Sequence, residues 1–221
     1  MKHISHKLID SLSDGVFSIA LTLLGLDVVS LVHKISESED FNGAMLDNWP
    51  TFLAYAFGFI VLFSWWYNYH VTGQYVAGTT AMIVWSHGLT MAWVALMPFG
   101  VALLAENLNT QHMKWGVFYF GICLFGQNWT ALIQRVIVGI FKGDTTITWT
   151  DDFIMADWSQ EEQQKFLIIF NLIPTVIGIV AVLICFINPW LALAVYMIHI
   201  LTLGNPVKSL NSLVPMWNKL R

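Results

Sequence analysis

The amino-acid sequence predicts an all-α, polytopic membrane protein with six transmembrane helices in a single domain, residues 1–221. Two observations carry this prediction. Of all residues 57% are hydrophobic and only 11% are charged, whereas about a quarter of the residues of a soluble domain are charged. The chain also contains several apolar stretches of about twenty residues, which is the length of a helix that crosses a hydrocarbon core.

The first apolar stretch, residues 13–32, is predicted as the first transmembrane helix. No small-residue cleavage site follows it, so we expect it to remain in the mature chain. At 3.6 residues per turn it has two neighbouring stripes. The small, polar stripe consists of Ser11, Asp14, Ser18, Thr22 and Gly25, and the aliphatic stripe of Gly15, Ile19 and Leu26.

The polar stripe has two interpretations. A carboxylate at the centre of a membrane helix costs about 2.5–3.5 kcal/mol on insertion scales, so Asp14 and its stripe are expected to face protein or water. Ser18, Thr22 and Gly25 can be small residues that let helices pack closely, or they can line a path for a solute. Since the sequence has no internal duplication, a path would need several copies of the chain around a rotation axis.

Five further apolar stretches follow, and they predict the remaining helices. Their expected bounds are 51–70, 81–104, 115–141, 165–187 and 190–203. Trp49-Pro50 is expected to anchor and start the second helix, and the proline in MPFG, residues 97–100, to interrupt the third near its end. The fourteen residues of the last stretch barely span a membrane unless the helix continues past Gly204-Asn205-Pro206.

Two short motifs predict helix boundaries in the second half. Ser159 and Glu162 have the spacing of a capping box, which opens a helix. Asn188-Pro189 predicts a tight turn between the last two helices. Pro174 lies inside the fifth predicted helix.

Positive charges predict the orientation, because loops on the cytoplasmic side carry an excess of Lys and Arg. Six helices put both termini on one side of the cell membrane. With cytoplasmic termini, eight basic residues lie inside and two lie outside. The inner set is Lys2, Lys7, Arg135, Lys142, Lys165, Lys208, Lys219 and Arg221, and the outer set is Lys34 and Lys114.

Several function classes find no support in the sequence. It contains no run of Lys and Arg that could bind nucleic acid. It also lacks the common hydrolase, phosphate-binding and metal-binding motifs, so we expect no enzyme, cofactor or metal site. Cys123 and Cys185 lie within apolar stretches and are expected to act as small hydrophobic residues. His87 and His199 are expected to be hydrogen-bonded packing residues, with proton sensing as the alternative.

Four segments together resemble a known family. They are SDGVFSIALTLLGLD in the first predicted helix, WPTFLAYAFGF and WYNYH at the two ends of the second, and ALMPFGVALLAEN closing the third. In order and spacing these segments resemble the bacterial members of the endolysosomal potassium channel family, transmembrane protein 175. The resemblance covers about the first half of the chain.

The resemblance implies a potassium-permeable cation channel, a homotetramer in the lipid bilayer whose first helix lines the pore without a TVGYG-type filter. Large aliphatic side chains form the constriction in this family, and these positions correspond to Ile19, Leu23 and Leu26. Thr22 belongs to the polar layer beside them. The polar stripe worked out above adds Ser18 to that layer. Apolar rings of this kind gate by dewetting a narrow neck.

The resemblance also implies a polar cluster that joins Asp14 to Asn68 and His70 at the end of the second helix; the alternative is a simple interfacial cluster. The family motif carries an arginine and a phenylalanine where this chain has Leu8 and Leu12. Asp27 is expected either to form a ring that attracts cations at the pore mouth or to be a solvated carboxylate at a helix end.

Two other function classes stay open at the level of sequence. A secondary transporter of a small solute or proton-coupled ion would use Pro98 and Pro174 as hinges. A structural or accessory membrane protein would conduct nothing.

Overall fold

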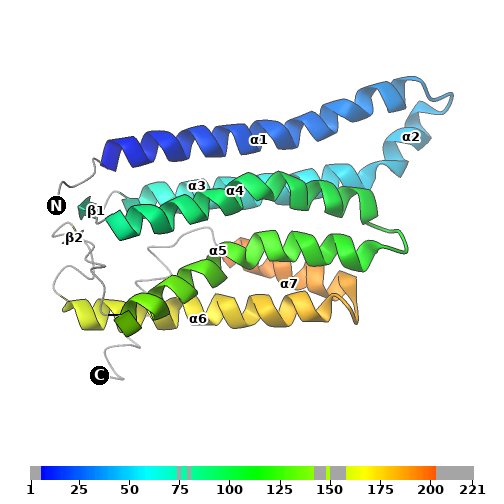
Figure 1. Cartoon of the computed structure of the whole chain (residues 1–221). Helices are drawn as coiled ribbons and strands as arrows, with labels where there is room; N and C mark the ends of the chain where they lie inside the picture. Colours follow the sequence, from blue (N-terminus) through cyan, green and yellow to red (C-terminus); the bar gives the residue numbers. More distant parts are fainter. Residues whose placement is uncertain (1–5, 74–75, 79–80, 142–147, 150–157, 203–221) are drawn as a thin grey trace.

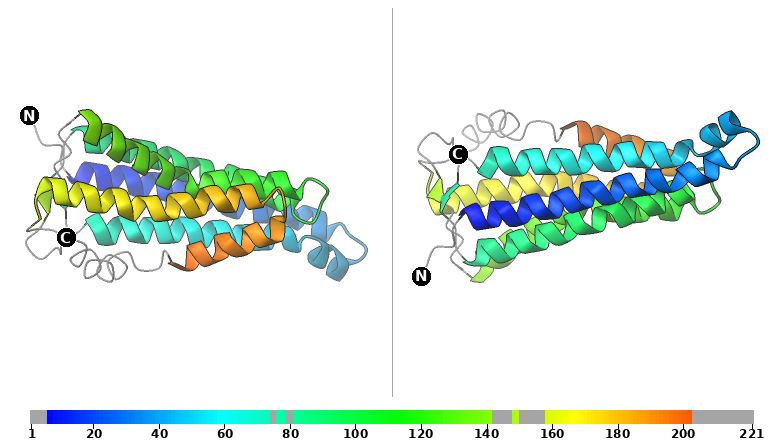
Figure 2. Two further views of the ribbon diagram at one scale, coloured as in Figure 1. Left: turned by 90° about the horizontal axis from the view of Figure 1, so that it is seen from below. Right: turned by 90° about the horizontal axis from the view of Figure 1, so that it is seen from above.

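The structure, a computed structural model, describes residues 6–73, 76–78, 81–141, 148–149 and 158–202. The long helices run side by side in an elongated bundle (Figure 1, Figure 2). In chain order the elements are α1 (His6–Ser36), α2 (Phe41–Asp47), α3 (Trp49–Gly73), β1 (Val76–Gly78), α4 (Ala81–Asn107), α5 (Met113–Phe141), β2 (Thr148–Trp149), α6 (Gln160–Ile184) and α7 (Pro189–Thr202). We call the end of the bundle where α1 begins the near end, and the end where α1 stops the distal end.

Four of the described helices are long and apolar enough to cross a membrane, by length and composition. These spans are Ile9–Ser36, Trp49–Val71, His87–Asn107 and Met113–Ile133. The apolar parts of α6 and α7, Asn171–Ile184 and Pro189–Ile200, are shorter. The chain is therefore an α-helical, multi-pass membrane protein with four long apolar spans. The continuation of α7 past Gly204 lies outside the described residues.

One side of α1 is packed against α3 and α4. The side chains on this side recur every three or four residues, as expected for one face of a helix. They are Ser13, Phe17, Ala20 and Leu24, all fully buried. Gly58 of α3 receives Leu24, because a Cβ at that position would meet the leucine side chain. The packing fixes which side of α1 is left uncovered.

The core continues from α1 through α3, α4 and α5 to α7. Val61, Val94 and Phe120 are fully buried along this line. On α7 the hydroxyl of Tyr196 donates a hydrogen bond to the carbonyl of Val117, 3.3 Å away. The phenol ring can reach that carbonyl because Gly121 has no side chain; a Cβ there would overlap the ring.

At residues 97–100, where a kink or a loosened turn was expected, α4 is not broken: it continues as a helix from Ala81 to Asn107 with Pro98 inside it. Met97 and Gly100, on either side of the proline, are buried. On α5 the thiol of Cys123 donates to the carbonyl of Leu96 at 3.7 Å. The carbonyl that the proline leaves without its helical donor is that of Val94, four residues earlier. Pro174 lies inside α6 in the same way.

The predicted helix boundaries agree with the structure where a capping motif marks them. The hydroxyl of Ser159 accepts from the amide of Glu162 at 3.3 Å, and the Glu162 carboxylate accepts from the amide of Ser159 at 3.0 Å. This capping box starts α6 at Gln160, five residues before the predicted bound. At the start of α7 the side-chain oxygen of Asn188 accepts from the amide of Leu191 at 3.1 Å.

Three short elements are absent from the sequence prediction. The seven-residue helix α2 follows α1 and is capped by Asp40. Strands β1 and β2 pair antiparallel, with Val76 opposite Trp149 and Gly78 opposite Thr148. These strands are too short to carry an alternating pattern of polar and apolar residues.

Candidate functional site

The uncovered face of α1 is the main candidate site, because it carries large apolar side chains that nothing in the protomer covers. Ile19, Leu23 and Leu26 are 63, 44 and 59% exposed. These are the three predicted constriction residues, and all of them point away from the bundle. On an ideal helix they lie within about 60° of one another. In this chain the face either meets lipid or meets another copy of the protein.

The predicted polar layer borders this face. Ser18 and Thr22 are both exposed. The hydroxyl of Thr22 donates to its own helix, with the carbonyls of Ser18 and Ile19 as acceptors, the latter at 3.1 Å. Because the single proton of the hydroxyl is used in this way, the lone pairs of its oxygen are available on the uncovered side. Thr22 lies about 60° from Ile19 around the helix, whereas Ser18 lies about 100° away.

Asp14 forms a polar cluster with α3 at the near end of the bundle. Its Oδ1 accepts from the indole nitrogen of Trp66 at 3.0 Å and lies 3.1 Å from Nε2 of His70. The other ring nitrogen of His70, Nδ1, lies 3.0 Å from the carbonyl oxygen of Trp66. Since both neighbours of the ring are acceptors, both contacts are hydrogen bonds only when the imidazole carries two protons.

The structure thus brings together two of the three residues predicted for this cluster, Asp14 and His70. Asn68 is half-buried on α3. It is two positions from both Trp66 and His70, which turns it about 200° around the helix from each of them. Trp66, which sequence reasoning missed, takes the place expected of Asn68. The backbone of Leu8 is part of α1, but its side chain lies outside the described residues.

A second set of contacts joins α1 to α3 and α4 near Asp14. The hydroxyl of Tyr69 donates to Asp10 at 2.9 Å. The hydroxyl of Ser13 donates to the carbonyl of Ile9 at 2.7 Å and lies 2.6 Å from Nε2 of His87. The Ser13 proton is committed to Ile9, so the proton shared with His87 is carried by Nε2 of the histidine. The rings of Tyr69 and His87 stack with centroids 4.7 Å apart.

Together these polar contacts fix the rotation of α1 about its axis. Side-chain hydrogen bonds between membrane helices contribute about 0.6 kcal/mol each on average, and here they act on three neighbouring positions of one helix face: Asp10, Ser13 and Asp14. The uncovered face with Ile19 lies on the opposite side. His87, expected to be a hydrogen-bonded packing residue, has this role in the contact with Ser13.

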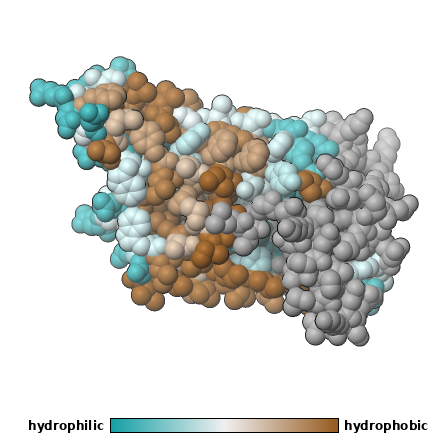
Figure 3. Space-filling model, turned by 180° about the vertical axis from the view of Figure 1, so that it is seen from behind, coloured by the Kyte–Doolittle hydropathy of each residue, from teal (hydrophilic) through white to brown (hydrophobic). Residues whose placement is uncertain are grey.

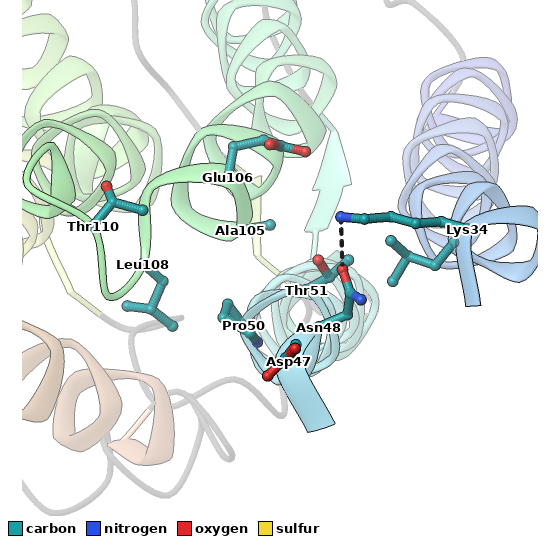
Figure 4. Close-up of a pocket in the computed structure, with 10 residues that line it drawn as sticks. Lys34, Asp47, Asn48, Pro50, Thr51, Ala105, Glu106, Leu108 and Thr110 are labelled. Carbon is teal, nitrogen blue, oxygen red and sulfur yellow. Dashed lines mark hydrogen bonds between the residues drawn. The ribbon is translucent and has the colours of Figure 1, made fainter. Parts of the chain in front are cut away.

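At the distal end, the predicted mouth residue Asp27 is half-buried and close enough to Glu106 for the two carboxylates to repel each other. A cavity of about 210 Å³ opens nearby between the ends of α1, α3 and α4. Figure 4 shows Lys34 reaching across it, where its ammonium donates to Oδ1 of Asn48 at 3.2 Å. Within the described part of the chain, no three His, Cys, Asp or Glu side chains come together as a metal site.

The fold and the site define a class: a multi-pass α-helical membrane protein whose first helix presents an uncovered apolar face beside hydroxyl groups. Residues 9–98 match the model of the family described as endosomal/lysosomal potassium channel TMEM175. The match covers less than half of the chain, from α1 into α4, and over these residues the chain is similar to this family.

Individual proteins with related names are similar to part of the chain. A potassium channel of Chamaesiphon minutus is 39% identical over 100 residues, which are 45% of this chain and 49% of the relative. A potassium channel of Streptomyces collinus is 35% identical over 104 residues, which are 46% of this chain and 48% of the relative. The aligned part of the chain thus spans about half the length of these relatives.

Similarity of fold to a solved structure extends over more of the chain than the sequence alignments do. The crystal structure of a lysosomal potassium-selective channel TMEM175 homolog from Chamaesiphon minutus superposes with a TM-score of 0.70 and 23% identity. The superposition covers 90% of this chain and 96% of that chain. The second half of the chain, from α5 to α7, therefore has the TMEM175 fold as well.

Proposed function

We propose that this chain is one subunit of a homotetrameric, potassium-permeable channel in the cell membrane, with α1 of each copy lining a central pore. The observation that carries the proposal is the uncovered apolar face of α1 with Ile19, Leu23 and Leu26. The family description and the names of both bacterial relatives support potassium as the permeant ion.

In this assembly the three aliphatic residues form stacked rings. Ile19 and Leu26 are seven positions apart, so the rings extend over about 10 Å of the pore at 1.5 Å per residue. A neck of this length with apolar walls loses its water readily, which raises the cost of moving a hydrated ion through it. The rings are therefore the proposed constriction and gate.

Thr22 supplies polar atoms inside the same neck. Its oxygen lone pairs, left available by the hydrogen bonds to its own helix, can replace part of the hydration shell of a passing cation. Potassium sheds its hydration shell more readily than sodium, so the combination favours potassium weakly. Ser18 extends the polar layer at the border of the path.

The two ends of the pore have different proposed roles. A ring of four Asp27 carboxylates at the distal mouth raises the local concentration of cations. At the near end, the contacts of Asp14 with Trp66 and His70 hold α1 in register with α3. Each subunit is proposed to cross the membrane six times, with α6, whose 25 residues are about 37 Å long, as the fifth crossing and α7 in the sixth. Both termini then lie in the cytoplasm, by the distribution of basic residues.

Flux from liposomes tests this proposal. The purified protein is reconstituted into vesicles loaded with potassium thiocyanate, whose membrane-permeant anion compensates the charge, and potassium efflux and internal pH are followed together. A channel carries potassium down its gradient with no fixed ratio to proton movement. A constant proton-to-potassium ratio would instead identify a transporter, and the complete absence of flux would identify an accessory protein.

A further inference from the structure

A projecting part of the molecule has no role in the proposed pore. We call residues 29–47 the outer arm; it comprises the last part of α1, the connection and α2. It extends beyond the rest of the bundle at the distal end (Figure 1, Figure 2). In Figure 3 it is the projection at the upper left, where polar and apolar surface adjoin. Its exposed large apolar side chains are Val29, Val32, Phe41, Met45 and Leu46.

Helix α2 is fully formed although it has no core to pack on. Asp40 caps it, with Oδ1 accepting from the amide of Gly43 at 2.9 Å, and Asn48 closes it with hydrogen bonds to Ala44. None of its residues is buried, and Leu46 is 72% exposed. Since a helix of seven residues is far too short to be stable by itself in water, its apolar side chains need a partner surface.

The part of the arm after α1, which is the connection and α2, is placed on the aqueous side of the membrane boundary. Trp49 stacks on Trp190 with centroids 6.4 Å apart, and Trp115 packs edge-on against Phe186 at 5.5 Å. Aromatic groups of this kind mark the interface between membrane and water, and α2 precedes Trp49 on the aqueous side. The 31 residues of α1 are also about 46 Å long, which exceeds a hydrocarbon core of about 30 Å.

The charge of the arm argues against a bilayer surface as its partner. Helices that lie on membranes carry Lys and Arg on their polar face. The arm is acidic instead, and its one lysine, Lys34, is bonded to Asn48. Its four carboxylates belong to Glu37, Glu39, Asp40 and Asp47. The complementary charge at the distal end is on Lys114, which is exposed beside Trp115 at the start of α5.

We propose that the outer arm docks on a neighbouring copy of this chain. Phe41, Met45 and Leu46 pack against the distal end of that copy, and the carboxylates of the arm face its Lys114. The arms then surround the pore mouth, and each arm contacts the adjacent subunit. This inference rests on the proposed assembly around α1, because only that assembly brings the distal ends of several copies together.

Spin-label accessibility at Leu46 tests the docking in the full-length protein in liposomes. Cys123 and Cys185 are replaced by alanine, and Leu46→Cys carries the label. A docked arm protects the label from both oxygen, which enriches in lipid, and a water-soluble nickel complex. High access to oxygen would place the arm in the bilayer, and high access to nickel would leave it in water; either result overturns the inference. Ile187→Cys, 87% exposed at the same end, is the control that stays accessible.

A second measurement identifies the partner surface. Protein made in normal and heavy-isotope media is mixed before assembly and treated with a carbodiimide, which joins a lysine amine directly to a carboxylate. Docking predicts cross-linked peptides that pair Lys114 of one isotope with the arm of the other, and a Lys114→Arg control removes them. The inference would be overturned if Lys114 and the arm were cross-linked only in peptides that carry the same isotope label.

The two proposals fail separately in this design. A disulfide between copies at Ile19→Cys reports the assembly around α1 independently of the arm. If that disulfide forms while the Leu46 label stays accessible, the arm inference alone is wrong. If neither signal appears, the tetrameric pore itself is wrong.

Discussion

Replacing Ile19 by alanine separates a pore residue from a packing residue. Ile19 is 63% exposed in the protomer, whereas Leu24, on the opposite side of the same helix, is 1% exposed. Leu24→Ala leaves a cavity against α3 and is expected to cost about 2 kcal/mol. This is the lower end of the range for buried leucines, because lipid supplies little of the hydrophobic term. Ile19→Ala should cost less than about 0.5 kcal/mol, as for surface substitutions.

The two substitutions should affect ion flux in the opposite order: Ile19→Ala should change it more than Leu24→Ala does. Ile19→Ala removes three heavy atoms from each subunit at the proposed constriction, so it should raise potassium leak from liposomes severalfold and lower discrimination against sodium. Leu24→Ala should lower the melting temperature in detergent without raising flux per folded channel. Ile198→Ala, equally exposed at 63% on α7, is the control and should change neither. Unchanged currents for a well-folded Ile19→Ala protein would refute the placement of Ile19 at the constriction.

Three further substitutions test other parts of the structure. Thr22→Val should reduce selectivity while expression is unchanged and the free energy of unfolding stays within about 0.5 kcal/mol of wild type, and failure to assemble would instead favour a packing role. Asp14→Ala leaves Trp66 and His70 without their acceptor, so thermal unfolding should show a loss of about 1–2 kcal/mol, which unchanged stability would contradict. Gly121→Ala should cost about 1–3 kcal/mol, because the new methyl group overlaps Tyr196, and a neutral melting curve would count against that contact.

The parts of the fold that depend on local sequence could be predicted. Apolar stretches of membrane length gave the long helices, and the Ser159 capping box placed the start of α6 to within a few residues. A break at Pro98 is absent: α4 is packed on both α3 and α5, and such contacts join residues distant in sequence. The sequence prediction missed α2, whose seven residues carry too little periodicity to distinguish a helix from a loop.

The rotation of α1 and α3 is the part of the candidate site that the sequence leaves open. Helical periodicity separates the two sides of α1 but does not say which side the bundle covers. The burial of Phe17 and Leu24 settles that question in the protomer. Asp14 and His70 were expected to meet, whereas Trp66, the second partner of Asp14, depends on the rotation of α3, which no pattern in the sequence specifies. Trp66 and His70 are four residues apart, and this spacing is the one available signal that both lie on the same face.

Disulfide formation at residue 19 tests the central claim most directly. In a background without Cys123 and Cys185, the account predicts that Ile19→Cys forms disulfide-linked pairs under mild oxidation, within a complex whose native mass equals four chains. Ile198→Cys, with the same exposure on α7, should stay monomeric on a denaturing gel. If Ile19→Cys forms no more disulfide-linked pairs than Ile198→Cys does, or if the complex has the mass of a single chain, then copies of α1 do not meet and the proposed pore does not exist.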